Sequence, residues 1–193
     1  LNALIAATGN ASATSAGNLT VSGTAVNLAT NSGGTTSFGV TSLTGGLTAT
    51  SVGDITQTGA IITGAPSSLT SSTGDIVLTN SGNRFSGATS LTATVGDITF
   101  GGTVNGNLST NAGGATSFGA TTLTGGLTTT SVGDITQTGA ITTGAASSIT
   151  SSTGEITLTN PGNAFSGATT LTATIGDITF GGTVNGNLST NAG

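Results

Sequence analysis

The chain has 193 residues, a net charge of −5 and only 4% charged residues, with Arg84 as its single basic side chain. It contains no cysteine, histidine, lysine, tyrosine, tryptophan or methionine. These values exclude a disulfide scaffold, a thiolate metal site and nucleic-acid binding, which requires many phosphate-neutralising cations. No run of 18 apolar residues is present, so we expect no membrane span in this segment.

The sequence contains a long internal repeat. Residues 36–113 align without a gap with residues 116–193 and differ at twelve positions: Val40/Ala120, Ser42/Thr122, Ala49/Thr129, Ile62/Thr142, Pro66/Ala146, Leu69/Ile149, Asp75/Glu155, Val77/Thr157, Ser81/Pro161, Arg84/Ala164, Ser90/Thr170 and Val95/Ile175. Repeats of this kind mark solenoids, propellers or arrays. We expect residues 1–193 to be one segment of a longer repetitive chain, with a full repeat over 36–115 and an incomplete one over 116–193.

Apolar residues recur on a shorter period within each repeat. Large aliphatics open successive segments, and their spacings follow the same order in both repeats: Leu28, Leu47, Leu69, Leu91, Leu108, Leu127, Ile149, Leu171 and Leu188. A second apolar position follows in each segment, at Phe38, Ile55, Ile76, Ile98, Phe118, Ile135, Ile156 and Ile178. A third follows that one, so three apolar positions per segment predict three short strands per turn.

The expected strands are short runs in which aliphatic or small residues alternate with other residues, mostly threonine, as in Ile55-Thr56-Gln57-Thr58, Leu91-Thr92-Ala93-Thr94 and Ile156-Thr157-Leu158-Thr159. Alternation with a period of two, in runs rich in Val, Ile and Thr, is typical of β-strands. Gly-Gly, Gly-Asp and Asn-Gly pairs between the runs supply turns. Helix is excluded, because Thr, Gly, Ser and Asn are poor helix formers and no helical apolar stripe is present.

Such strands could form an antiparallel meander or a coil of parallel strands. The coil is favoured because residues at the same phase then stack like on like, whereas a meander needs tight hairpins and the loops here vary in length. We expect an all-β, right-handed parallel β-helix (β-solenoid) with about 20 residues and three short strands per coil. Ile55, Ile76 and Ile98 should then lie in one file along the axis.

The predicted core consists of the apolar positions of the two repeats. Its members are Leu47, Ile55, Ile61, Leu69, Ile76, Phe85, Leu91, Ile98, Val104, Leu127, Ile135, Ile141, Ile149, Ile156, Phe165, Leu171, Ile178 and Val184.

Two pairs of segments resemble the repeats of filamentous haemagglutinin-like bacterial surface adhesins, which are secreted by the two-partner or autotransporter route. The segments are Gly53-Asp54-Ile55-Thr56-Gln57-Thr58-Gly59-Ala60-Ile61 and its copy at 133–141, and Asn83-Arg84-Phe85-Ser86-Gly87-Ala88 and its copy at 163–168. The resemblance is one of composition and spacing and covers nearly the whole chain. It implies a long right-handed parallel β-helix at the bacterial cell surface, without active-site residues or cofactors.

Acidic residues recur at one phase of the repeat. Asp54, Asp75 and Asp97 each follow a glycine at equivalent positions of consecutive coils, so their carboxylates should stack about 5 Å apart. Such a column is a weak candidate for Ca²⁺ binding, because calcium favours oxygen ligands. We favour a structural role, in which each Asp accepts hydrogen bonds from nearby backbone N–H groups at a corner and stays in water.

Catalysis and ice binding are weaker hypotheses. The chain lacks His, Cys, Lys and Tyr as acids, bases or nucleophiles, so we do not expect an enzyme. Rows of Thr-x-Thr resemble the ice-binding faces of some antifreeze proteins. They are predicted on several sides of the coil, where the preference of threonine for exposed strands explains them.

We therefore expect the chain to be the structural shaft of a secreted bacterial cell-surface fibre or adhesin, forming a stiff extracellular stalk or a biofilm matrix filament. Expected partners are copies of the chain itself, joined end to end or side by side, and host-surface or matrix ligands. The alternative within binding proteins is an adhesin whose flank itself recognises a glycan or a protein.

Overall fold

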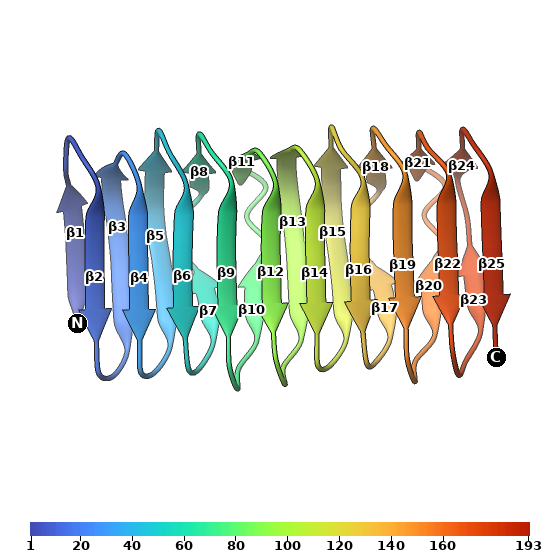
Figure 1. The fold of residues 1–193 in the computed structure, drawn as a ribbon, viewed down its shortest axis with the longest axis horizontal. Coiled ribbons are helices and arrows are strands. Elements are labelled where there is room, and N and C mark those ends of the chain that lie inside the picture. Colours follow the sequence, from blue (N-terminus) through green and yellow to red (C-terminus); the bar gives the residue numbers. More distant parts are fainter.

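The structure is a computed structural model that describes the whole chain, from Leu1 to Gly193. It is an all-β parallel solenoid of about ten coils and contains no helix (Figure 1). One coil comprises about 19 residues, as expected for a solenoid repeat. The N- and C-termini lie at opposite ends of the rod. The structure accordingly has no helix long and apolar enough to cross a membrane.

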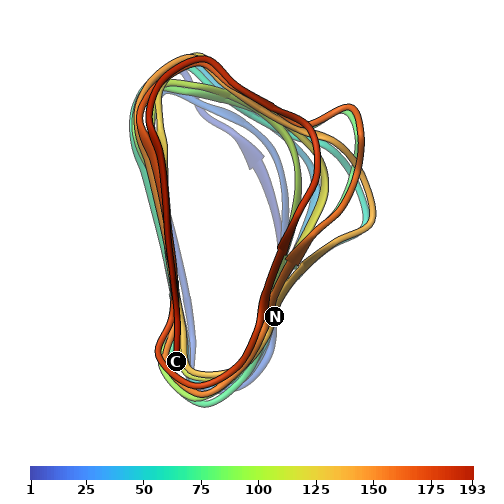
Figure 2. The same ribbon diagram turned by 90° about the vertical axis from the view of Figure 1, so that its right-hand side faces the viewer.

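Ten strands of five residues each form the sheet that we call sheet B, with one strand per coil. They are β2 (Ala11–Ser15), β4 (Leu28–Ser32), β6 (Leu47–Ser51), β9 (Ser67–Ser71), β12 (Thr89–Ala93), β14 (Leu108–Ala112), β16 (Leu127–Ser131), β19 (Ser147–Ser151), β22 (Thr169–Ala173) and β25 (Leu188–Ala192). Seen along the axis, this side of every coil superimposes on a nearly straight line (Figure 2).

Fifteen strands form the opposite sheet, sheet A. They are β1 (Asn2–Ala6), β3 (Leu19–Ala25), β5 (Thr36–Leu43), β7 (Ile55–Gln57), β8 (Ile61–Thr63), β10 (Ile76–Leu78), β11 (Arg84–Ser86), β13 (Ile98–Asn105), β15 (Thr116–Leu123), β17 (Ile135–Gln137), β18 (Ile141–Thr143), β20 (Ile156–Leu158), β21 (Ala164–Phe165), β23 (Ile178–Phe180) and β24 (Thr183–Val184).

The coils differ in how many strands they give to sheet A. In some coils a single long strand crosses the sheet, as β5 and β13 do, whereas in others a turn divides it into two, as between β7 and β8. These turns are the bulges on one side of the end view (Figure 2). A uniform three-stranded coil is therefore not confirmed, because several coils contain only two strands.

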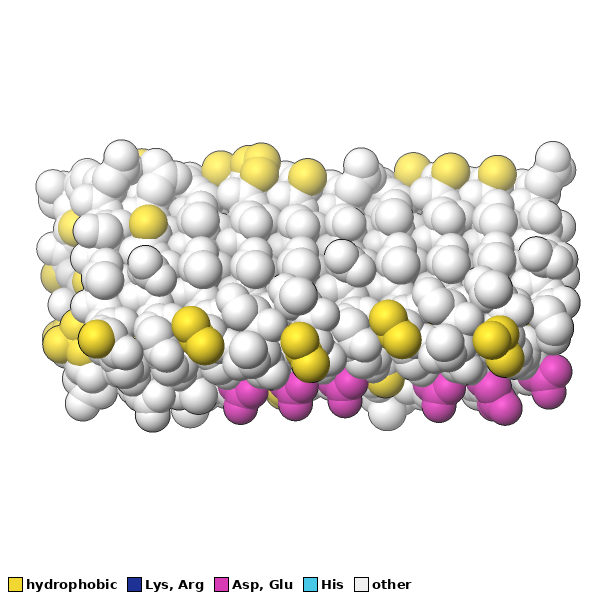
Figure 3. Space-filling model, turned by 60° about the horizontal axis from the view of Figure 1, so that its bottom comes forward, with side chains coloured by type: hydrophobic (Ala, Val, Ile, Leu, Met, Phe, Trp, Pro, Cys, Tyr) yellow, Lys and Arg dark blue, Asp and Glu magenta, His cyan; other side chains and the backbone are white.

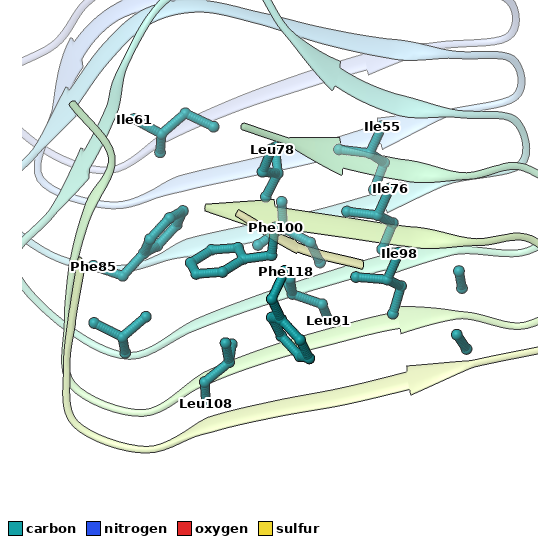
Figure 4. Close-up of a cluster of buried hydrophobic side chains, with 14 of the residues drawn as sticks. Ile55, Ile61, Ile76, Leu78, Phe85, Leu91, Ile98, Phe100, Leu108 and Phe118 are labelled. Atoms are coloured by element: carbon teal, nitrogen blue, oxygen red, sulfur yellow. The ribbon is translucent and has the colours of Figure 1, made fainter. Parts of the chain in front are cut away.

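The predicted file of isoleucines is confirmed. Ile76 pairs with Ile55 on one side and with Ile98 on the other, and all three are fully buried (Figure 4). Thr36 and Thr116 occupy the same position in neighbouring coils. Phe38 and Phe118, the second apolar positions of their segments, lie two residues further along the strand and outside this file.

The aliphatic residues that open successive segments occupy two inward columns of sheet B. Leu28 pairs with Leu47, but Leu69 pairs with Ala49 and with Leu91, two residues further along the strand. Inward positions recur at every second residue, so a side chain can move by two residues and still point into the core. Strands β9 and β12 therefore begin before their large aliphatic residue, at Ser67 and Thr89, whereas β4, β6 and β14 begin on theirs.

Of the predicted core residues, sixteen are buried, and Ile178 and Val184 are half-buried. Both lie in the coil at the C-terminal end of residues 1–193, so their exposure reflects the end of the described segment and not a different packing. Phenylalanine side chains also pack in the interior, where Phe85 and Phe100 of adjacent coils lie with their ring centroids 6.1 Å apart (Figure 4). The ring centroids of the copies Phe165 and Phe180 lie 5.7 Å apart, so the packing recurs with the sequence repeat.

Replacing Ile76 with Ala should lower the free energy of unfolding by about 2–5 kcal/mol, because it leaves a cavity between two buried isoleucines. Val77→Ala is the matched control: Val77 is the next residue and is only half-buried, so its loss should be below about 1 kcal/mol. Denaturant unfolding followed by circular dichroism measures both. Equal losses for the two variants would contradict the stacked core.

Candidate functional site: the acidic edge and the amide pairs

All six carboxylates of the chain lie along one edge of the rod. They occupy the turns that lead from sheet B to sheet A, in two runs of three: Asp54, Asp75 and Asp97, then Asp134, Glu155 and Asp177 (Figure 3). We call this row the acidic edge. Ala115 occupies the equivalent position in the coil between the two runs.

Each aspartate of the first run accepts a hydrogen bond from the backbone of the next coil. The Oδ1 of Asp54 accepts from the Asp75 N–H at 2.9 Å, that of Asp75 from the Asp97 N–H at 2.8 Å, and that of Asp97 from the Ala115 N–H at 2.7 Å. Asp134 accepts from the Glu155 N–H in the same way, at 2.9 Å. The carboxylates therefore join successive coils at a corner where the turn would otherwise leave an N–H unpaired.

The structure contains no group of three or more His, Cys, Asp or Glu side chains that could hold a metal ion. Asp54, Asp75 and Asp97, the weak Ca²⁺ candidates, are stacked in neighbouring coils, and each commits one oxygen to the backbone. This geometry favours the corner role over calcium binding.

A second set of polar side chains lies inside the solenoid, where the sequence had not indicated a site. Asn83 is fully buried and forms a reciprocal amide pair with Gln57: each side chain donates to the other, at 2.8 and 3.0 Å. The Oδ1 of Asn83 also accepts from the Ile61 N–H at 3.0 Å, and its Nδ2 donates to the Gly101 carbonyl at 3.2 Å.

The amide pair takes the place of backbone pairing that the turns interrupt. Strand β7 ends at Gln57 and β11 begins just after Asn83, so the backbone ladder is broken in both coils, and the two side chains satisfy the groups left inside. Gly102 of the next coil packs against Asn83 so closely that a Cβ added to the glycine would lie 2.7 Å from the Cβ of Asn83, which leaves no room for a side chain there. Gln137 and Asn163 repeat the arrangement with distances of 2.8 and 2.9 Å.

No signal in the sequence singles out these pairs. Gln57 and Asn83 are unchanged in the second repeat, but so are 66 of the 78 aligned positions, including the adjacent Gly82. Asn105 is likewise retained and is exposed, so retention of an amide does not indicate burial.

The other surface features carry little chemistry. One pocket lies near the N-terminal end and is lined by Ala7, Thr8, Thr24, Ala25, Val26, Ser42 and Thr44, none of them an acid or a base. Arg84 is exposed at the start of β11, and no carboxylate forms a salt bridge with it. Exposed apolar side chains stand in the turns beside the acidic edge, at Val52, Val95, Val132 and Ile175 (Figure 3).

Asp75→Asn should leave the free energy of unfolding nearly unchanged, because the amide oxygen can still accept a hydrogen bond from the Asp97 N–H, whereas Asp75→Ala should lower it by about 1–2 kcal/mol.

Adding millimolar Ca²⁺, or removing it with a chelator, should leave the melting temperature of the unsubstituted chain unchanged. A calcium-dependent rise that Asp75→Asn abolishes would restore the metal-site hypothesis.

Asn83→Ala should lower the free energy of unfolding by about 2–3 kcal/mol, because it leaves buried N–H and amide groups of Ile61 and Gln57 without partners. Asn185→Ala is the matched control, since Asn185 is exposed, lies outside sheet B and has a side chain that makes no hydrogen bond. In a double-mutant cycle, the loss from Asn83→Ala should shrink when Gln57 is already alanine. Additive losses would show that the two amides act independently.

A family model described as repeats of unknown function (DUF5649) matches the chain twice, over residues 25–92 and 105–172. The two matches lie at equivalent positions of the two sequence repeats, and together they cover more than half of the chain. Comparisons with curated proteins and with solved structures gave no match. The chain therefore belongs to the DUF5649 family of repeats.

Proposed function

We propose that this chain is a segment of the shaft of a secreted bacterial surface fibre, whose work is to hold other parts of the protein away from the cell or to form a matrix filament. The observation that carries this proposal is the unbroken register of sheet B. From β2 to β25, every strand pairs in parallel with the equivalent strand of the next coil. Backbone hydrogen bonds of this kind run along the rod axis and resist both stretching and bending.

Several further features support the shaft. The surface repeats with the sequence, so that neither repeat presents a large cluster of side chains that the other lacks. The single pocket contains no acid or base, and the chain has no histidine, cysteine, lysine or tyrosine that could serve it, which supports a non-enzymatic role. The resemblance to filamentous haemagglutinin-like adhesins supports secretion and an extracellular location at the bacterial cell surface.

We also infer a right-handed coil with three strands in its longer turns. The support comes from the course of the ribbon in Figure 1, in which the nearer strands run downward and the more distant ones upward as the chain advances from left to right. Right-handed crossovers are the general rule for parallel strands.

The competing function is an adhesin flank that itself binds a glycan or a protein. Arg84, replaced by alanine in the second repeat, is the position where the surface charge of the repeats differs most sharply. It pairs in register with Ile62, which is exposed and is threonine in the second repeat. Ser42, which pairs with Ile62 on its other side, is threonine in the second repeat, so the differences form a file of three exposed side chains. A binding flank would need a wider group of differences than this file.

The shaft is tested by changing its length. Inserting ten extra copies of residues 36–115 into the full-length secreted protein should lengthen the fibres on intact cells by about 190 Å, because each copy adds four coils of about 4.8 Å. Negative-stain electron microscopy measures the length and the width. Fibres of unchanged length, or material confined to the cell interior, would contradict the proposal.

A further inference from the structure

The outer face of sheet B is uniform along the whole rod. Within each five-residue strand, the first, third and fifth residues point inward, and the second and fourth point out. The twenty outward side chains are uncharged and no larger than asparagine: Ser12, Thr14, Ala29, Asn31, Thr48, Thr50, Ser68, Thr70, Ser90, Thr92, Ser109, Asn111, Thr128, Thr130, Ser148, Thr150, Thr170, Thr172, Ser189 and Asn191.

The polar groups of this face have no partners within the chain. Some hydroxyls at the corners and in the interior do form hydrogen bonds, as Thr73 does with the Val52 carbonyl and Thr110 with Thr129. None of the outward residues of sheet B makes such a bond. Nineteen of the twenty positions therefore offer free hydroxyl or amide groups on a straight surface (Figures 2 and 3).

We propose that a second copy of the chain packs on this face, sheet B against sheet B. This inference rests on the proposed shaft and names the surface through which shafts associate side by side. Ten strands about 4.8 Å apart, each five residues long, make a face of about 45 by 16 Å. Two such faces bury about 1,400 Å² in total, within the range of about 1,200–2,000 Å² found in stable, specific interfaces.

The side chains suit close packing of two sheets. Small residues at all outward positions let the two sheets approach closely, and columns of Ser, Thr and Asn can interdigitate and pair their polar groups across a dry interface. The face contains no charge to desolvate. All carboxylates stand on the acidic edge beside it, and Arg84 lies on sheet A.

The acidic edge selects between the two symmetric arrangements. A two-fold axis parallel to the strands would bring both acidic edges to the same side of the interface, where they would repel each other. A two-fold axis parallel to the rod puts them on opposite sides. It also keeps both rods pointing in the same direction, as two shafts anchored on one cell would.

The test places charge on this face and, as a control, on sheet A. Thr50→Glu with Thr130→Glu adds two carboxylates to the sheet B face, one in each repeat, away from both ends of the rod. Ser42→Glu with Thr122→Glu adds the same charge at exposed positions of β5 and β15. Sedimentation over a concentration series should show a dimer for the unsubstituted chain and for the sheet A variant. The dimer dissociation constant of the sheet B variant should be at least tenfold higher.

Small-angle scattering identifies the geometry, and circular dichroism shows that each variant is folded. The dimer should have a larger cross-section than the monomer at the same length. A spin label on Ala16→Cys, in the exposed turn that follows β2 near one end of the rod and outside the face, should give a shorter label-to-label distance in this dimer than in an antiparallel one, because parallel rods place the two labels at the same end.

Three results would overturn the interface: a rod that stays monomeric at all concentrations, a dimer of doubled length and unchanged cross-section, or equal dissociation of both variants. Thermal hysteresis in a monomeric chain would show that the face binds ice and not a second copy, and would also overturn the interface. Each of these leaves the shaft intact. A compact particle in place of a rod would instead contradict the proposed function itself.

Discussion

The constant register of sheet B is the constraint on which the rest of the structure depends. Every coil must return to the same straight, five-residue strand, whatever its length. The coil from β4 to β6 is shorter than the coil from β9 to β12, and both satisfy this requirement because the additional residues are accommodated on the other side, in the turns of sheet A. One side of the solenoid is thus fixed by backbone hydrogen bonds, and the opposite side adjusts.

The interior adjusts along with it. Where the strand of sheet A is continuous, Phe and Val or Leu fill the space, and where it is divided, the Gln57–Asn83 pair and its copy fill the gap with hydrogen bonds. A buried amide pair is an expensive replacement for an apolar side chain unless all its groups are satisfied. Here the Ile61 N–H and the Gly101 carbonyl, which lie where the backbone ladder is interrupted, bond to the Asn83 side chain. The amide pair and the turns that interrupt the ladder therefore depend on each other.

The architecture could be predicted from the sequence, but the exact pairing of residues between neighbouring coils could not. Alternating Thr and aliphatic residues, with matching residues in the two repeats, predict parallel stacking, and Ile55, Ile76 and Ile98 stack as expected. The two columns of sheet B were not predicted, because Leu47 and Leu69 look equivalent in sequence and differ by two residues in register. Equally, nothing in the composition distinguishes Gln57 from an exposed strand residue; only the turn that follows it places its amide inside. The acidic edge was predicted as a corner, and the hydrogen bonds that its aspartates accept agree with that role.

Each sequence repeat of 80 residues makes four coils of the solenoid, and this bears on how such chains change in length during evolution. One repeat comprises a whole number of coils, so an added copy would meet its neighbour through the same strand pairing that joins the two repeats here, β14 with β16. Unequal recombination between repeats in a gene would then add or remove units without creating a new packing problem. Organisms carrying such genes could vary the reach of the protein in steps of one unit, while selection on the core remained unchanged.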